Sequence, residues 1–365
     1  MSSIRKVART CQVSPMTVSL VLNNPDTGRV SPETRTRVLR VVRELGYRPK
    51  PRSVESESFK TIGLVANPDA GMFSGDHYLG RVLEGILRQP DSRRHNMMMF
   101  APELFAQKDV HRAVRSFCDG KCDGLIIVAP NKNSPLARAL ILRGLPLVII
   151  GTSELFDDIG DVLAPAVIDV DNHRVGREAT EYLLAHGHRR IAFVGGPEFV
   201  VSTWQRLAGY REAMAAAGLA IDPRLVRMHV PKTYHPHHMV AEWLSLPKSE
   251  RPTAIFAWND GSAMETRAAL RQHGVRLPEE MSLIGIDDNS DAATGDPPLT
   301  SFRQPFDRIG ALTLDALHRQ FEMSPGDEEP NDRHLLPATI VVRDSVAPCP
   351  DVEAVRAGVD CASPT

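Results

Sequence analysis

The sequence predicts a two-lobed α/β body preceded by a small all-α helix-turn-helix headpiece. Beyond residue 60, short β-branched and apolar runs alternate with stretches whose apolar residues recur every three to four positions. Before residue 60, two short amphipathic helices flank a tight turn and a third helix follows. At 365 residues the chain is long enough for two or three domains.

The headpiece is organised around Val7–Asn23. A first helix is expected over residues 4–11, and Ser14 is placed to cap a second helix that begins at Pro15. The apolar residues with inward-facing i, i+3, i+4 spacing in that helix are Val18, Val21 and Leu22. A third helix over residues 34–45 follows Ser31 as cap and ends at Gly46. This order of helices is typical of a unit that places one helix in the major groove.

The charge of the chain is divided unevenly. Residues 1–60 hold 12 Lys and Arg against 5 Asp and Glu, an excess of seven positive charges. The whole chain has a net charge of −2, so the remaining residues carry −9. A cationic module on an anionic body is the electrostatic pattern of a DNA-binding head.

Residues 4–49, from I-R-K-V-A-R-T-C-Q-V-S-P-M-T-V-S-L-V-L-N-N to R-E-L-G-Y-R-P, resemble the headpiece of the lac-repressor (LacI/GalR) family of bacterial transcription regulators. Runs such as D-V-D-N-H-R-V-G-R-E-A-T at 169–180, P-T-A-I-F-A-W-N-D at 252–260 and S-L-I-G-I-D-D at 282–288 extend the resemblance to about 340 residues. The resemblance implies a periplasmic-binding-protein-like body whose chain crosses between lobes three times, near Val170, Ser301 and Met323.

These observations predict four segments. The headpiece spans residues 1–49, a hinge or linker spans 50–60, and a two-lobed ligand-binding and dimerisation domain spans 61–345. Residues 346–365 are expected to form a disordered tail. Within the body, lobe 1 is expected over 61–170 and 302–323, and lobe 2 over 171–301 and 324–345.

The linker departs from the family pattern. In the family this stretch folds on the operator into a hinge helix, and a leucine enters the minor groove. The candidate hinge residues here are Lys50, Ser53, Val54 and Ser56, and Ser56 stands where the leucine is expected. Pro51 falls inside the expected helix. Either Val54 or the linker backbone replaces the leucine wedge, or minor-groove insertion is absent.

The resemblance places the base-reading positions on Pro15, Met16 and Leu20, where the family typically has arginine at the position of Leu20. All three side chains are apolar, so they can meet thymine methyl groups but cannot make bidentate hydrogen bonds. The expected phosphate contacts are Ser14, Thr17, Ser19, Asn23, Arg29 and Thr34. Because one headpiece reads half a site, we expect a homodimer or tetramer on a pseudo-palindromic operator in double-stranded DNA.

Candidate effector-binding residues follow the predicted strands, because ligands bind at the carboxyl ends of strands in open α/β sheets. The resemblance assigns ligand contacts to Arg206, to Asn259 or its neighbour Asp260, and to Asp287. The full candidate set is Arg206, Asp287, Asn259, Asp260, Tyr78, Asn67 and Trp204, with Tyr234 as a weaker member. The alternative for a strand-end aspartate is a helix cap, above all for Asp288.

The predicted function is a sequence-specific DNA-binding transcriptional repressor whose operator affinity is set by a small-molecule effector, a sugar or sugar derivative. Two alternatives stay open: an effector-independent architectural DNA-binding protein, and a nucleobase-responsive regulator. An enzyme is disfavoured because the sequence has no nucleophile elbow, P-loop, zinc motif or dinucleotide fingerprint, so no cofactor is expected. A transport-linked binding protein needs an export signal, which the first 25 residues lack.

Five scattered cysteines predict a reducing cytoplasm without a disulfide framework. No run approaches the roughly 20 apolar residues of a membrane span, so no membrane partner is expected. Cys118 and Cys122 are interpreted as buried small residues, and His235, His237 and His238 as solvated loop histidines, so no metal is expected.

Overall fold

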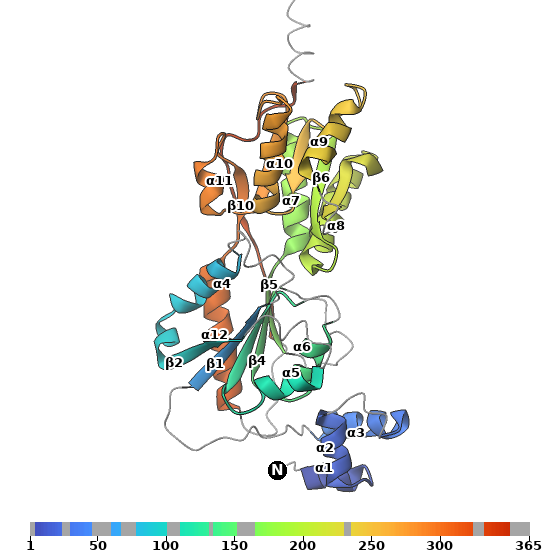
Figure 1. The fold of residues 1–365 in the computed structure, drawn as a ribbon, viewed down its shortest axis with the longest axis vertical. Helices are drawn as coiled ribbons and strands as arrows, with labels where there is room; N and C mark the ends of the chain where they lie inside the picture. Colours follow the sequence, from blue (N-terminus) through green and yellow to red (C-terminus); the bar gives the residue numbers. More distant parts are fainter. Residues whose placement is uncertain are drawn as a thin grey trace, which may run out of the picture. The chain divides into compact units, whose positions relative to one another are not determined.

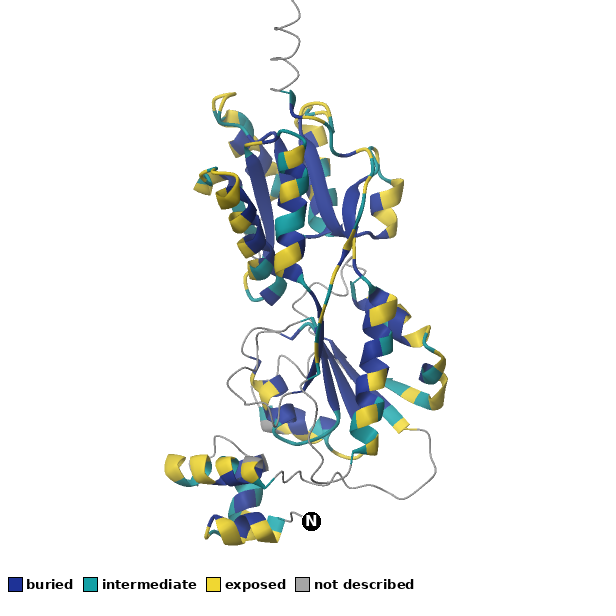
Figure 2. Ribbon diagram, turned by 180° about the vertical axis from the view of Figure 1, so that it is seen from behind, coloured by how far each residue is buried: buried dark blue, intermediate teal, exposed yellow. Residues whose placement is uncertain are grey.

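The computed structural model describes residues 4–23, 30–45, 60–66, 78–100, 110–130, 134–151, 165–229, 235–323 and 332–350. The chain divides into two compact units, shown in Figure 1. Unit 1 comprises Met1–Ser74, Tyr78–Asp169 and Phe306–Leu335, and unit 2 comprises Gly75–His77, Val170–Pro305 and Leu336–Thr365. Figure 2 shows that the central strands of both sheets are buried, whereas the outer strands are only partly buried and exposed residues lie mainly on the outer faces of the helices and in loops.

The headpiece consists of α1 (Ile4–Thr10), α2 (Pro15–Asn23) and α3 (Pro32–Glu44). It has its own hydrophobic core, formed by Val7, Ala8, Cys11, Val18, Val21, Leu22, Val38, Val41 and Val42. The Ser14 hydroxyl accepts the backbone N–H of Thr17 at 2.9 Å, and the Ser31 hydroxyl accepts that of Thr34 at 3.2 Å. Both predicted caps and all three predicted helices are therefore confirmed.

The body of unit 1 is a six-stranded sheet of order β11-β5-β4-β3-β1-β2 with helices on both faces. Its elements are β1 (Lys60–Ala66), α4 (Tyr78–Leu87), the 3₁₀ helix η2 (Pro90–Arg94), β2 (His95–Met99), α5 (Val110–Phe117), β3 (Gly124–Val128), α6 (Pro135–Ile141), β4 (Leu147–Ile150), β5 (Ala166–Val170), α12 (Phe306–Glu322) and β11 (Arg333–Leu336). Strands β1 to β5 pair in parallel, as their continuous apolar runs predict.

Unit 2 contains a second six-stranded sheet, of order β12-β10-β9-β8-β6-β7. Its elements are α7 (Asn172–Ala185), β6 (Ile191–Pro197), α8 (Val201–Ala216), the 3₁₀ helix η5 (Pro223–Leu225), β7 (Val226–His229), α9 (Pro236–Ser245), β8 (Ala254–Ala257), α10 (Asp260–Gln272), β9 (Ser282–Asp287), α11 (Ser290–Thr294), β10 (Thr300–Arg303) and β12 (Thr339–Val341). Only the pairing of β10 with β12 is antiparallel among the described pairs of this sheet.

Two of the three expected crossings lie elsewhere. We expected one near Ser301, but that residue lies inside β10, which pairs with β9 and β12 of unit 2, and the unit changes after Pro305. We expected another near Met323, but β11 belongs to the sheet of unit 1, so the chain leaves that unit only after Leu335. Both errors have one cause: β10 and β11 have four residues each, and their partners are distant in sequence, so no periodic run marks them.

We expected a disordered tail from residue 346, but the first residues of this segment make contacts with unit 2. The backbone N–H of Ala347 donates to the Ser282 hydroxyl at 3.1 Å, and that of Cys349 donates to the carbonyl of His186 at 2.8 Å. Cys349 is buried. Residues 346–350 therefore pack on unit 2, because unit 2 supplies partners for their backbone groups, whereas residues 351–365 lie outside the described part of the chain.

Helices α7 and α8 pack with their backbones in contact. A Cβ atom added at Gly176 of α7 would collide with the backbone carbonyl of Arg206 in α8, and one at Gly209 of α8 would collide with the carbonyl of His173. Only glycine permits this approach. The close packing of α7 and α8 therefore fixes the position of the Arg206 backbone relative to α7.

In the part of the chain that the structure describes, no helix has the length and apolar content needed to traverse a lipid bilayer.

Candidate nucleic-acid interface and candidate ligand site

The outward face of α2 carries the predicted base-reading side chains. Met16 is 73% exposed, Pro15 is exposed and Leu20 is partly exposed, whereas Val18 and Val21 on the other face are buried. Three apolar side chains that meet solvent on one face of a short helix are suited to contact a partner. This face is therefore the candidate nucleic-acid interface.

Two hydroxyl groups lie at the N-terminal end of this face. The hydroxyls of Ser14 and Thr17 are 2.9 Å apart and exposed or partly exposed, and Ser14 also caps the helix. A helix N-terminus with its partial positive charge attracts anions. The geometry is suited to a phosphate group beside Met16.

The other predicted phosphate contacts are less fully described. Ser19 and Thr34 are partly exposed, so both can meet solvent or a ligand. The backbone of Asn23 ends α2, but its side chain lies outside the description, as do Arg29 and the hinge residues Lys50, Ser53, Val54 and Ser56. All of these contacts stay predictions.

The turn between α1 and α2 is closed by backbone geometry. Gln12 has φ of 51°, in the left-handed region, and the N–H of Val13 donates to the carbonyl of Ala8 at 3.0 Å. This reverses the chain in three residues and lets Val18 of α2 pack into the same core as Val7 of α1. The sequence predicted the position of this turn but not its strained residue.

In unit 2 the candidate ligand site is built around Arg206. This side chain is buried on α8, where its Nε donates to the side-chain oxygen Oδ1 of Asn172 at 2.9 Å and its Nη1 donates to the Trp258 backbone carbonyl at 2.5 Å. Its guanidinium lies 5.5 Å from the centre of the Trp258 ring. A buried guanidinium fixed on two sides is a preorganised donor for hydroxyl, carbonyl or carboxylate oxygens.

Trp258 is a site residue that sequence reasoning missed. Its indole packs against Gly196, where an added Cβ would lie 2.6 Å from the ring atom Cε2 and 2.7 Å from the Thr203 hydroxyl oxygen. The buried Trp258 Nε1 and Thr203 Oγ1 have no hydrogen-bond partner among the described residues. A buried polar atom without a partner marks a place where a bound ligand or water completes the structure. Its position before Asn259 in the quoted run was the available signal.

Asp287 and Asp288 stand at the carboxyl end of β9 in unusual backbone conformations, with φ of 116° and 52°. The Gln304 amide donates to Asp287 Oδ1 at 2.5 Å. Non-glycine residues in these regions persist only where the surroundings hold them, and they cluster at binding sites. Asp287 is therefore a site candidate with structural support.

Asp288 is not a helix cap, contrary to the alternative considered for it. Arg303 Nε lies 2.6 Å from its Oδ2 and Arg343 Nη2 lies 2.5 Å from its Oδ1. The cap of α11 is Asn289, whose side chain accepts the N–H of Ala292 at 2.9 Å. The fold places two arginines from distant segments on Asp288, which spacing along the chain does not reveal.

Asn259 and Asp260, both predicted to lie at the effector site, also make structural hydrogen bonds. Asn259 caps α10 through the backbone N–H of Ser262 at 2.8 Å. Asp260 is fully buried, and both of its oxygens accept hydrogen bonds from protein groups, Ser301 Oγ at 2.6 Å and the N–H of Asn289 at 2.9 Å. The fold therefore uses the Asp260 carboxylate inside the unit, and its effector contact stays a prediction.

Burial raises the pKa of Asp260 to about 7. The hydrogen bonds from Ser301 and Asn289 lower this pKa and the nearby charge of Asp288 raises it, while Arg343 lowers it. Asp260 therefore changes its charge near neutral pH, unlike an exposed aspartate.

The aromatic candidates lie in different places. Trp204, on the first turn of α8, is 39% exposed and donates its indole N–H to the carbonyl of Glu198 at 2.7 Å. Tyr78 belongs to unit 1, where its ring packs edge-on against Phe306 with ring centres 5.8 Å apart. Asn67 and Tyr234 lie outside the described residues. The ligand contacts of all four candidates stay predictions.

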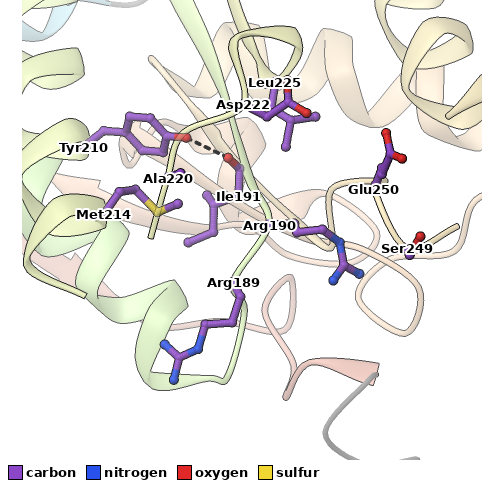
Figure 3. Close-up of a pocket in the computed structure, with 10 residues that line it drawn as sticks. All are labelled: Arg189, Arg190, Ile191, Tyr210, Met214, Ala220, Asp222, Leu225, Ser249 and Glu250. Atoms are coloured by element: carbon purple, nitrogen blue, oxygen red, sulfur yellow. Dashed lines mark hydrogen bonds between the residues drawn. The ribbon is translucent and has the colours of Figure 1, made fainter. Parts of the chain in front are cut away.

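Unit 2 also has a cavity of about 160 Å³ at the end of its sheet that lies opposite the candidate ligand site (Figure 3). It is lined by residues that precede or open β6, β7 and β8, including Arg190, Ile191, Leu225 and Glu250. Because these strands are parallel, the cavity lies at their amino ends and Asp287 at the carboxyl end of the sheet. The cavity is therefore separate from the candidate ligand site.

The cysteine and histidine clusters do not form a site with three metal-ligating groups within the described ranges. Burial raises the pKa of Cys122 to about 12, so this thiol stays protonated. The rings of His235 and His238 lie 5.3 Å apart.

Comparison with known proteins identifies both parts of the chain. The family model of bacterial regulatory proteins, lacI family, matches residues 3–50, and that of the periplasmic binding protein-like domain matches residues 180–346. The HTH-type transcriptional regulator CelR of Thermobifida fusca is 32% identical over 312 residues, covering 84% of this chain and 88% of its own. The HTH-type transcriptional repressor PurR of Aliivibrio fischeri strain MJ11 is 30% identical, covering 89% and 96%.

Solved structures agree with these relatives. A CelR–cellobiose complex has a TM-score of 0.67 at 29% identity and covers 94% of this chain and 100% of its own. The lac repressor dimer bound to operator has a TM-score of 0.65 at 24% identity, covering 95% and 99%, and so shares the fold. The chain belongs to the LacI family of bacterial regulatory proteins and is an HTH-type transcriptional regulator with a periplasmic-binding-protein-like body.

Proposed function

We propose that this regulator acts as a repressor that reads its operator with the exposed face of α2. The observation that carries the proposal is Met16, 73% exposed beside the hydroxyls of Ser14 and Thr17. Pro15, Met16 and Leu20 contact thymine methyl groups, and the hydroxyls contact phosphates. The operator is therefore recognised through apolar contacts and DNA shape, with little direct readout of G·C pairs at these positions.

We propose that two copies bind one pseudo-palindromic operator as a homodimer. A single nine-residue helix covers only half a site, and a two-fold protein pairs with a two-fold DNA sequence. The linker segment 50–60 joins each head to its body, with Val54 or the linker backbone in place of a leucine wedge. With about ten phosphate contacts per dimer, log K falls with log salt at a slope of about −9.

The effector that we propose is a sugar or sugar derivative bound at the carboxyl ends of the strands of unit 2. Arg206 and Asp287 supply a fixed donor and a fixed acceptor, the combination that orients a polyhydroxylated ring. Trp258 supplies an aromatic surface beside Arg206. The cellobiose complex of the relative CelR supports this ligand class.

The test is selection of binding sites from fragmented genomic DNA, followed by titration of the best site with cellobiose and a panel of other sugars, sugar acids and nucleobases. We expect a pseudo-palindromic motif and release of the operator by at least one sugar. An inducer needs to bind the DNA-incompetent state about 100-fold better, a coupling of about 2.7 kcal/mol. Binding to no double-stranded fragment at low salt would contradict the DNA-reading role. A response to nucleobases alone would contradict the sugar class.

A further inference from the structure

Asp260 has a different task from the ligand contacts around it. Asp260 is the first residue of α10 and is fully buried. Its two carboxylate oxygens accept hydrogen bonds from two other segments of unit 2. One oxygen accepts from Ser301 of β10 at 2.6 Å, and the other from the backbone N–H of Asn289 at 2.9 Å. A buried carboxylate that is this well satisfied organises its surroundings.

The Ser301 hydroxyl links Asp260 to the backbone of Asp288. It accepts the backbone N–H of Asp288 at 3.0 Å while it donates to Asp260. Asp260 thus holds two consecutive backbone N–H groups, those of Asp288 through Ser301 and of Asn289 directly. These groups directly follow Asp287, the effector-site candidate whose φ is 116°.

The space around Asp260 is adapted to this role. A Cβ at Gly285 of β9 would collide with Asp260 Oδ1, so only glycine leaves room for the carboxylate at that point of the strand. The left-handed conformations of Asp287 and Asp288 are unfavourable for residues with a side chain, so the chain adopts them only under constraint. The hydrogen bonds of Asp260 supply that constraint.

We propose that Asp260 is a positioning residue for the effector site, and that its carboxylate, through Ser301 and Asn289, holds the backbone that presents Asp287 to the ligand. The proposal rests on the proposed function, since it gives Asp287 its role there. It replaces the direct ligand contact expected of Asp260 with an indirect one.

The device is sensitive to protonation near neutral pH. Only the ionised carboxylate accepts at both oxygens without restriction, whereas a carboxylic acid turns one oxygen into a donor. Burial raises the pKa of Asp260 to about 7, and the charged groups that act on it are Asp288, which raises this pKa, and Arg343, which lowers it. Arg303 acts from the far side of Asp288. The hydrogen bonds from Ser301 and Asn289 lower the pKa of Asp260, so they are stronger with the ionised carboxylate. Because Asp260 stays buried when these bonds weaken, lowering the pH from 8 to 6 protonates it and loosens its hold on the segment 287–289.

The decisive measurement is hydrogen–deuterium exchange of the segment 287–289 in the full-length protein without effector, corrected for intrinsic rates. In the wild type we expect protection to be at least fivefold higher at pH 8 than at pH 6. Asp260→Ala should lose at least tenfold at pH 8, and Ser301→Ala should lose protection at Asp288. Asp260→Asn should keep intermediate protection that is equal at the two pH values, because the amide preserves the shape but does not titrate.

Two controls make the measurement interpretable. Asp291→Asn removes an exposed carboxylate of α11 in the same neighbourhood and should match the wild type. Protection of β8 reports whether each variant is folded, and Asp260→Asn and Ser301→Ala carry the test if Asp260→Ala does not fold. Equal wild-type protection at pH 6 and pH 8, or unchanged protection in a folded Asp260→Ala, would overturn the proposal.

A second arm measures the Kd of cellobiose by calorimetry at pH 8 and pH 6. We expect a wild-type Kd at least fivefold weaker at pH 6, and no such change in Asp260→Asn. A pH-independent Kd beside a pH-dependent segment would overturn the positioning role. If wild-type protein does not bind cellobiose, that result counts against the proposed ligand, and the exchange measurement still decides the role of Asp260.

Discussion

The headpiece and the ligand site of unit 2 reach their functional arrangement in different ways. In the headpiece, the outward side chains and the core residues alternate within α2, nine residues long. In unit 2, Asn172, Arg206 and Asp287 come from three segments, with 34 residues between the first two positions and 81 between the last two. The first arrangement depends on helical periodicity, and the second on contacts that only the folded sheet creates.

The comparison also shows how polar residues are used. The Ser14 hydroxyl caps a helix and contacts the Thr17 hydroxyl, and both groups remain available to solvent. In unit 2, two polar residues that the sequence assigned to the ligand also hold the protein together, Asn259 as a cap and Asp260 as a buried acceptor. Near a buried strand end, a polar side chain can accept hydrogen bonds either from backbone N–H groups or from a ligand.

The largest expected effect tests the tertiary basis of the unit 2 site. Gly176→Ala forces α7 and α8 apart against the carbonyl of Arg206, so we expect a loss of about 3 kcal/mol in the free energy of unfolding, the upper end for overpacking. Urea unfolding monitored by tryptophan fluorescence measures it. The matched control is Gly80→Ala in α4, where an added Cβ meets nothing within 4 Å, and it should gain up to about 1 kcal/mol. A harmless Gly176→Ala would show that the helix contact does not fix Arg206.

The next prediction separates the two regions by function. Arg206→Ala removes the donor that Asn172 and Trp258 hold in place, so the effector response should weaken by about 100-fold, near 2.7 kcal/mol. Operator affinity without effector should change less than threefold, as measured by fluorescence anisotropy with the sugar found in the screen. Arg206→Lys keeps the charge without the planar fork and should recover little. Equal loss of operator affinity would mean that the two regions are not separable.

A third prediction tests whether α2 specifies the operator. Leu20→Arg introduces a side chain that can bind guanine in a bidentate manner, so the preferred half-site should change with about 2 kcal/mol of discrimination. Selection from random DNA measures the change. Leu335→Arg adds the same charge at an exposed leucine of β11 and should leave the motif unaltered. Identical motifs for Leu20→Arg and wild type would remove Leu20 from the base-reading set.

The smallest effect concerns the caps of the headpiece. Ser14→Ala and Ser31→Ala each remove one cap hydrogen bond and should each destabilise the headpiece by about 1 kcal/mol. Hydrogen exchange of α2 and α3 in the full chain measures this loss. Only Ser14→Ala should also reduce operator affinity at matched salt, because only Ser14 lies beside the base-reading face. Equal affinities would assign Ser14 a purely structural role.

Sequence alone determined the headpiece, its caps, its inward face, the parallel α/β class and the family, because each depends on local periodicity, turn chemistry or a contiguous motif. The tertiary structure decided the short strands β10 and β11, the ion pairs of Asp288, the place of Trp258 beside Arg206 and the buried role of Asp260. These features join residues far apart in the chain. Whether a carboxylate faces a ligand or a backbone N–H depends on which segments the sheet brings beside it, and no local pattern records that choice.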